Sequence, residues 1–66
     1  MRRPDIMQFF TYAHLPQHLQ DVSRPFCELA ERVLEVTGAG AEQSVALRKL
    51  LEAKDAAVRA ALQQQA

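Results

Sequence analysis

The chain has 66 residues, and its eight basic and eight acidic side chains cancel to a formal net charge of zero. A chain of this length forms one small domain, residues 1–66, and buries only about 60% of its unfolded surface, so it needs a further source of stability. The lone cysteine, Cys27, excludes an intrachain disulfide, and neutrality argues against a protein that holds long nucleic acid through many phosphates. Association with further copies of the chain is the remaining route to stability.

We expect no targeting segment at the N-terminus. Met1-Arg2-Arg3 is a basic start of the kind found in export signals, but no apolar stretch follows it. No run of residues approaches membrane-spanning length. We therefore expect a soluble, cytosolic protein without a membrane partner.

The first segment, residues 1–15, lacks helical periodicity and carries Pro4 early, which predicts an extended or irregular arm. Residues 8–16 read QFFTYAHLP and hold three of the four aromatic residues of the chain. Aromatic rings close to arginines stack on planar ligands and neutralise their charge, or they anchor an interface between subunits. The arm therefore points to a partner beyond the monomer.

The second segment, residues 16–37, is predicted to be helical but broken near Pro25. Pro16 suits a first helical turn, and Ser23 is a good N-cap for a helix that restarts there, with Pro25 in its first turn. A single helix kinked at Pro25 is the alternative. Gly38 is expected to end the helix in a left-handed conformation. The apolar positions at helical spacing are Phe26, Leu29, Ala30, Val33, Leu34 and Thr37.

The third segment, residues 41–64, is rich in Ala, Leu and Lys and predicts a second helix. Two amphipathic helices joined by a short glycine loop form an antiparallel hairpin, so the expected class is all-α. Each helix covers only part of the other's apolar stripe, and we therefore expect a helical homo-oligomer. The stripe of the second helix comprises Leu47, Leu50, Leu51, Val58, Ala61 and Leu62.

Lys54 lies in the middle of this apolar stripe, where a cation is costly unless an anion answers it. Its aliphatic stem can lie along the apolar surface. The ammonium group then lies at the edge of the apolar stripe or pairs with a glutamate of the first helix. Alternatively, the ammonium faces a phosphate in a pocket between subunits.

Two oppositely oriented ion pairs are predicted on another face of the second helix. They comprise Arg48, Glu52, Asp55 and Arg59. Such a face is usually solvated. Around a symmetry axis it would instead gather Arg59 from several subunits into an anion site.

His14 and His18 stand four residues apart, a spacing that metal ligands use on a helix. Pro16 lies between them and favours a helix that begins after His14, so a structural or ligand-contacting role is expected rather than metal binding. Cys27 is most simply a packing residue. We find no nucleophile system, glycine-rich phosphate loop or carboxylate dyad, and we expect neither enzymatic activity nor a cofactor.

Tyr12 and Arg24 have two interpretations. In the first, Phe9, Phe10 and Tyr12 attach the arm to the helices of a neighbouring subunit. In the second, Tyr12 stacks on a nucleobase while Arg24, near a helix start, meets a phosphate.

Three strings of the sequence resemble a family of small phage proteins that share a hairpin domain. They are FTYAHLP (residues 10–16), VSRPF (residues 22–26) and ALRKLLEAKDAAVR (residues 46–59). The family comprises the anti-CBASS cyclic-oligonucleotide sponges and the related Thoeris anti-defence sponges. The resemblance covers nearly all of the chain from residue 8 onward.

The resemblance implies a non-enzymatic helical homo-oligomer, often a hexamer, that sequesters cyclic nucleotide messengers in the cytoplasm of the infected bacterial host. In the family, a Tyr of the arm and a basic residue early in the next helix line a cyclic-dinucleotide pocket between protomers. Tyr12 and Arg24 match these positions best. Phe10, His14 and Lys54 are further candidates for this pocket.

Some family members also hold a cyclic trinucleotide on a threefold axis through an arginine of the last helix. Arg59 is the nearest match in this sequence, with Arg48 as a second candidate. The competing expectation is a helical protein–protein interaction module without a nucleotide ligand. A helix-turn-helix DNA-binding protein is a weaker alternative, because the second helix offers few base-reading side chains.

Overall fold

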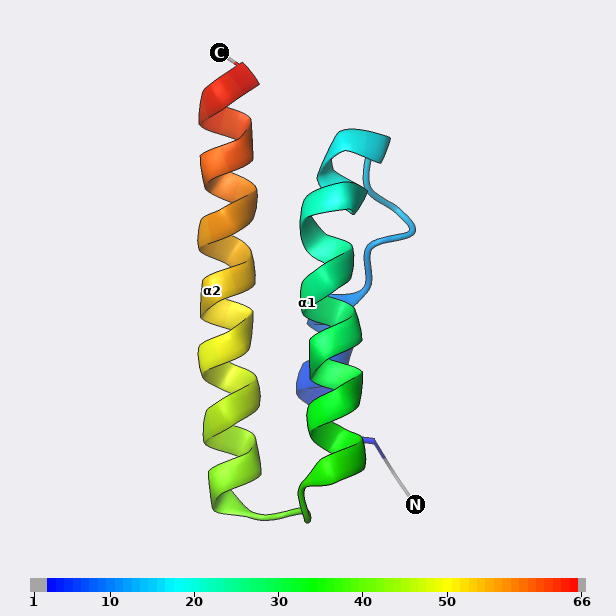
Figure 1. The fold of residues 1–66 in the computed structure, drawn as a ribbon, viewed down its shortest axis with the longest axis vertical. Coiled ribbons are helices and arrows are strands. Elements are labelled where there is room, and N and C mark those ends of the chain that lie inside the picture. The colour runs from blue at the N-terminus through cyan, green and yellow to red at the C-terminus, as the bar shows by residue number, and fades with distance from the viewer. Residues whose placement is uncertain (1–2, 66) are drawn as a thin grey trace.

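The structure is a computed structural model that describes the backbone of residues 3–65, and it consists of a helical hairpin preceded by a short 3-10 helix. The first two residues of the predicted arm lie outside this range. The elements are η1 (Asp5–Phe10), α1 (Gln17–Val36) and α2 (Ala41–Gln65). α1 and α2 lie side by side with opposite chain directions, and η1 packs against both (Figure 1). The predicted all-α hairpin is confirmed, and residues 3–65 contain no strand.

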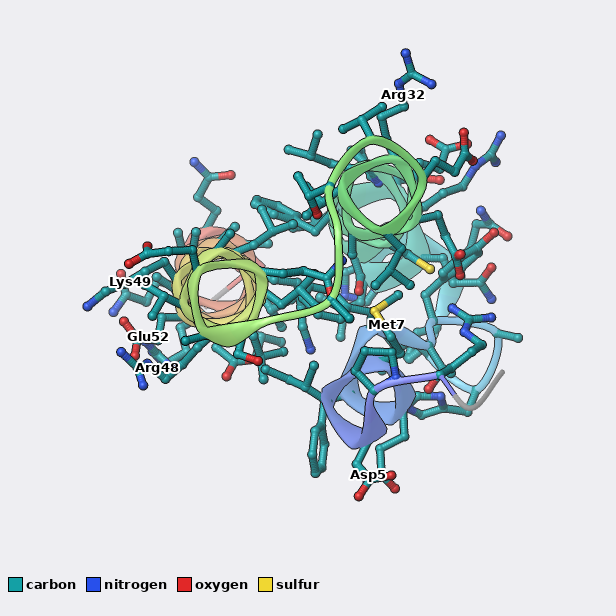
Figure 2. All side chains as sticks on the ribbon, turned by 90° about the horizontal axis from the view of Figure 1, so that it is seen from below. Asp5, Met7, Arg32, Arg48, Lys49 and Glu52 are labelled. Atoms are coloured by element: carbon teal, nitrogen blue, oxygen red, sulfur yellow. The ribbon has the colours of Figure 1, made fainter. Side chains whose placement is uncertain are left out.

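A small core forms where the three elements meet. Met7 and Phe10 come from η1, Ala30 from α1 and Leu47 from α2. Seen along the hairpin, Met7 lies between η1 and the two helices (Figure 2). Two of these four buried residues belong to the N-terminal segment, so that segment is part of the folded domain.

The expectation of an extended or irregular arm is wrong for residues 5–10, which form a 3-10 helix. The helix begins after Pro4, whose carbonyl accepts the amide of Met7 at 3.1 Å. Side chains three residues apart fall on one side of a 3-10 helix, so Met7 and Phe10 are buried together. Beyond η1, residues 11–15 are irregular as predicted, with a turn in which the Leu15 amide donates to the Tyr12 carbonyl at 3.0 Å.

The predicted break near Pro25 is also wrong, because α1 runs without interruption from Gln17 to Val36. Ser23 is not a cap: its side chain is fully buried within the helix, and its Oγ has no hydrogen-bond partner. Leu19, Ser23 and Ala30 lie at helical spacing on the buried face of α1. Packing of this face outweighs the hydrogen bond that Pro25 cannot donate.

We expect Pro25→Ala to stabilise the protein by about 2 kcal/mol. Proline costs about 3 kcal/mol more than alanine inside a helix, and the greater freedom of the unfolded alanine chain offsets about 0.4–1 kcal/mol of the gain. A thermal melt followed by circular dichroism measures the change. Pro16→Ala is the control, because Pro16 precedes the first turn of α1 and interrupts no helical hydrogen bond. A Pro25→Ala melting temperature at or below that of the wild type would contradict this account of α1.

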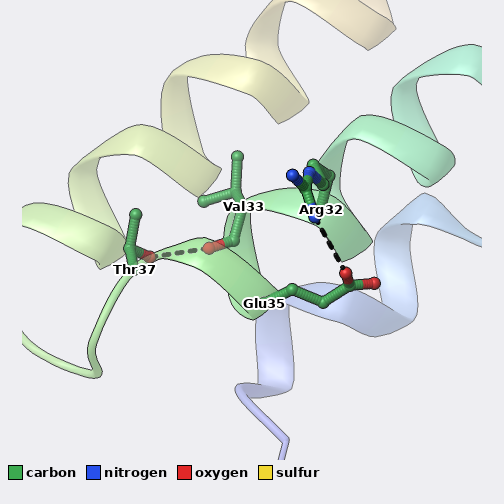
Figure 3. A network of polar contacts seen from close by, with 4 residues as sticks. All are labelled: Arg32, Val33, Glu35 and Thr37. Atoms are coloured by element: carbon green, nitrogen blue, oxygen red, sulfur yellow. Dashed lines mark hydrogen bonds and ion pairs between the residues drawn. The ribbon is translucent and has the colours of Figure 1, made fainter.

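Thr37 ends α1 and joins it to α2. Its amide and its Oγ1 both donate to the carbonyl of Val33, at 3.1 Å and 2.7 Å, and Figure 3 shows the side-chain bond. From α2, Gln43 Nε2 donates to Thr37 Oγ1 at 2.9 Å and to the Thr37 carbonyl at 3.2 Å. The predicted left-handed stop at Gly38 is wrong: Thr37 is extended, and the positive φ in the described chain is at Gly40.

Neither α1 nor α2, over the residues that the structure describes, has a stretch apolar enough to cross a membrane.

Candidate functional site

An open pocket of about 450 Å³ lies between α2 and the N-terminal segment, and we call it the arm–α2 pocket. Its volume falls within the range of about 300–1,000 Å³ that is usual for small-molecule sites. One wall consists of side chains from α2 and the other of side chains from η1 and the turn that follows it. The lining residues are Gln8, Phe9, Thr11, His14, Leu15, Leu51, Lys54, Asp55, Val58 and Arg59.

The α2 wall combines an apolar surface with charges. Leu51 and Val58 are half-buried and two turns apart, and Lys54 lies between them on the same stripe. Only 14% of the Lys54 side chain is exposed, and its Nζ lies 3.1 Å from Oδ1 of Asp55. The ammonium therefore pairs with its neighbour in sequence, and the predicted partner in the first helix is not the one observed.

The opposite wall offers the ring of Phe9, which is 56% exposed, whereas the adjacent Phe10 is fully buried. Successive side chains of a 3-10 helix point about 120° apart, so only one of two adjacent rings can enter the core. Phe10 was a candidate for ligand contact, but the structure places it in the core, where it has no surface to offer. Phe9, and not Phe10, supplies the aromatic ring that lines the pocket.

His14 lies in the turn before α1 and lines the pocket together with Leu15. Gln20 of α1 holds this turn, because its Nε2 donates to the carbonyl of Leu15 at 2.8 Å and to that of Ala13 at 3.4 Å. This wall of the pocket is therefore held in two places. The side chains of η1 that enter the core fix its first part, and the hydrogen bonds from Gln20 fix the turn.

The charge of the pocket favours an anion. Two cations, Lys54 and Arg59, line the pocket with one carboxylate, Asp55, so the lysine, arginine and aspartate together leave a local excess of +1. Within the described part of the chain, Arg59 has no ion-pair partner, so its guanidinium is available to an incoming group. Guanidinium groups bind phosphate oxygens through paired hydrogen bonds, and an exposed phenyl ring stacks on planar groups.

Tyr12 and Arg24, the pair singled out from the sequence, are not lining residues of this pocket. Tyr12 is half-buried in the segment between η1 and α1. Arg24 is exposed on α1, where its Nε lies 3.7 Å from Oε2 of Glu28. Their predicted pocket between protomers needs surfaces from two chains, and it stays a prediction.

Arg48 lies far from the pocket residue Arg59. It precedes Arg59 by eleven residues, about 16 Å along the helix axis. Together with Lys49 and Glu52, it projects from the outer side of α2, away from α1 and η1 (Figure 2). Glu52 pairs with Lys49 at 4.0 Å, so the ion pair predicted between Arg48 and Glu52 is not the pairing that forms.

A second open pocket, of about 400 Å³, lies between η1 and α1 and includes Cys27. Arg3 Nη2 donates to Glu31 Oε1 at its edge and links the N-terminal segment to α1. Burial raises the pKa of the Cys27 thiol, and the nearby Glu31 carboxylate raises it further. The thiol therefore stays protonated at neutral pH and is a poor nucleophile.

Residues 3–64 contain no cluster of three or more His, Cys, Asp or Glu side chains that fits a metal ion. His14 lines the arm–α2 pocket, whereas His18 is exposed within α1 and is not a lining residue. The two rings that share a metal-ligand spacing in the sequence thus belong to different environments.

A search of protein-family models, of curated proteins and of solved structures finds no match to this chain.

Of the candidates from the sequence, Lys54 and His14 line this pocket together with Arg59, which was predicted for a separate trinucleotide site. Phe9 was considered only as an anchor to a neighbouring subunit and not as a pocket residue. Only the relative placement of η1 and α2 makes Phe9 and Lys54 neighbours across a pocket. The available signal was the FF pair itself, since two adjacent aromatics in a short helix cannot both enter one small core.

Proposed function

We propose that the protein is a non-enzymatic binding protein that captures cyclic oligonucleotides, with the arm–α2 pocket as part of the binding site. The observation that carries this proposal is the position of Lys54, a largely buried cation that shares an open pocket with Arg59 and the exposed ring of Phe9. The two cations would pair with phosphates of such a ligand, and the phenyl ring would stack on one of its bases.

The energetics are compatible with capture by few contacts. Stacking of one base on an aromatic side chain contributes about 1–3 kcal/mol. A charge-assisted hydrogen bond to a phosphate contributes about 1.5–3 kcal/mol, and the partly desolvated surroundings of Lys54 strengthen its attraction to an anion. A cyclic dinucleotide presents two bases and two phosphates. Two protomers related by twofold symmetry would therefore each contact one base and one phosphate.

The resemblance to the phage sponges supports a biological role for such capture. A protein that binds a cyclic messenger without turning it over lowers the free concentration of the messenger in the cytoplasm of the infected cell. We infer that this blocks CBASS-type antiviral signalling. In this proposal Tyr12 and Arg24 of a second protomer complete the cyclic-dinucleotide site, and Arg59, which lines the arm–α2 pocket, is also the candidate residue for a trinucleotide site.

We also propose that the protein is a homo-oligomer, with a hexamer as the expected form. Leu29 and Val36 are two turns apart on α1 and half exposed or more, and Val45 of α2 is partly exposed as well. A domain this small gains stability when a neighbouring subunit covers such side chains.

Light scattering tests the assembly, and we expect a mass several times the 7.4 kDa of one chain. The double variant Leu29→Glu/Val36→Glu should shift the mass toward that of the monomer, because charges would be buried in the interface. Glu35→Lys is the control, since it changes an exposed charge that pairs with Arg32 beside Val36. A wild-type mass of one chain would refute the oligomer, and an unchanged mass in the double variant would place the interface elsewhere.

Calorimetric titration with a panel of cyclic di- and trinucleotides tests the proposed function. We expect at least one cyclic dinucleotide to bind, with a linear dinucleotide of the same bases binding more weakly because it must be ordered on binding. Binding to none of the panel would contradict the proposal. The exposed apolar side chains of α1 would then favour the alternative function, a helical protein–protein interaction module.

A further inference from the structure

Asp55 has no role in the proposed capture of phosphates, and its position calls for an explanation. It is the acidic residue among the side chains that line the arm–α2 pocket. A carboxylate repels a phosphate, so a site built only to hold an anion would lose affinity by including one. Asp55 is also about half exposed, so its carboxylate is accessible to a ligand in the pocket.

The neighbouring lysine orients this carboxylate. Lys54 Nζ lies 3.1 Å from Oδ1 of Asp55, and the Lys54 side chain is itself largely buried, which restricts its movement. A carboxylate accepts hydrogen bonds at two oxygens through about four lone-pair positions, and one cation uses only part of this capacity. The remaining acceptor positions are free to meet donors from a ligand.

An ionised carboxylate only accepts hydrogen bonds, and the nucleobases differ in the donors they offer. The Watson–Crick edge of guanine presents two adjacent donors, N1–H and the N2 amino group, which match the two oxygens of a carboxylate. Adenine presents one amino donor beside the N1 acceptor, which a carboxylate repels. We propose that Asp55 is a specificity-determining residue that selects cyclic nucleotides containing guanine.

This inference rests on the proposed function and places the base edge next to Asp55 while Phe9 stacks on the ring face. A good bidentate contact favours the matching base by roughly 5- to 150-fold. We therefore expect the protein to bind the cyclic dimer of guanosine monophosphate about tenfold more tightly than the cyclic dimer of adenosine monophosphate.

Calorimetric titrations of both cyclic dimers against the wild type, Asp55→Asn and Glu52→Gln test the proposal. Asp55→Asn replaces one acceptor oxygen by a donor, so the preference for guanine should fall to about one. The affinity for the adenine ligand should stay the same or rise. Glu52→Gln removes a negative charge from the outer side of α2, one turn earlier, and should leave the preference unchanged. Thermal melts of the variants verify that each is folded.

Two results would overturn the proposal while leaving the capture function intact. One is equal affinity of the wild type for the two cyclic dimers. The other is an Asp55→Asn variant that binds both more tightly by the same factor, which would make Asp55 only a counterion of Lys54. If the wild type binds neither these dimers nor any other member of the panel, the proposed function fails and the guanine preference fails with it.

Discussion

Phe10→Ala is expected to remove most of the stability of the fold. Phe10 is fully buried at the meeting point of η1, α1 and α2. Truncation of a buried phenylalanine to alanine costs about 3–5 kcal/mol, and a domain of this size has a total stability of about 3–10 kcal/mol. Urea denaturation followed by circular dichroism at 222 nm, extrapolated to water, measures the loss.

Phe9→Ala is the matched control, because it removes the same ring from the adjacent position of the same 3-10 helix. Phe9 is 56% exposed, so we expect a change within about 1 kcal/mol. Equal losses for the two variants would mean that both rings are buried in solution, for instance by a neighbouring subunit. A small loss for Phe10→Ala would contradict the core described above.

Lys54→Glu is expected to abolish the binding of cyclic nucleotides, with an affinity reduced by a factor of about 100 or more. The change replaces a largely buried cation by a carboxylate beside Asp55, which turns an attractive pocket into a repulsive one. Removal of one partner from a buried charge pair costs about 2–5 kcal/mol, and reversal of the charge adds repulsion. Isothermal titration calorimetry with the tightest-binding member of the panel measures the effect.

Lys49→Glu is the corresponding control on the same helix. The substitution changes the charge by the same amount, but Lys49 projects from the outer side of α2 (Figure 2). The affinity should therefore stay within about a factor of two at physiological salt. Lys54→Met keeps the apolar stem and removes only the charge. It should melt no lower than the wild type while still losing affinity, which separates a binding defect from a folding defect. An equal loss of affinity for Lys49→Glu and Lys54→Glu would mean that Lys54 acts only through the overall charge of the helix and not through a contact with the ligand.

The hairpin was predictable because its signals are local. The apolar periodicity and the glycines between the segments predict two helical segments at about the observed positions, and for α2 also about the observed length. The course of α1 through Pro25 was not predictable in this way, because proline weakens a helix locally while the packing that compensates comes from α2 and η1. The same reason applies to η1, whose spacing of Met7 and Phe10 has meaning only once a core exists for both to enter.

The candidate site was predictable in part. A lysine in the middle of an apolar stripe is an energetic conflict that can be recognised in the sequence, and Lys54 does line a pocket. The choice between Phe9 and Phe10 depends on which side of η1 faces the helices, and the sequence letters are identical at the two positions. The pocket between protomers that was expected at Tyr12 and Arg24 stays a prediction, because the pattern of a single chain does not specify contacts between chains.

The most direct test of the central claim is a nuclear magnetic resonance titration of the isotope-labelled protein with the cyclic dinucleotide that binds most tightly. If the arm–α2 pocket holds the ligand, the largest amide shifts will fall in residues 8–15 and 51–59, on the two walls of the pocket. Shifts confined to α1 around Arg24 and Glu28, with residues 51–59 unchanged, would contradict the claim and move the binding site away from Lys54.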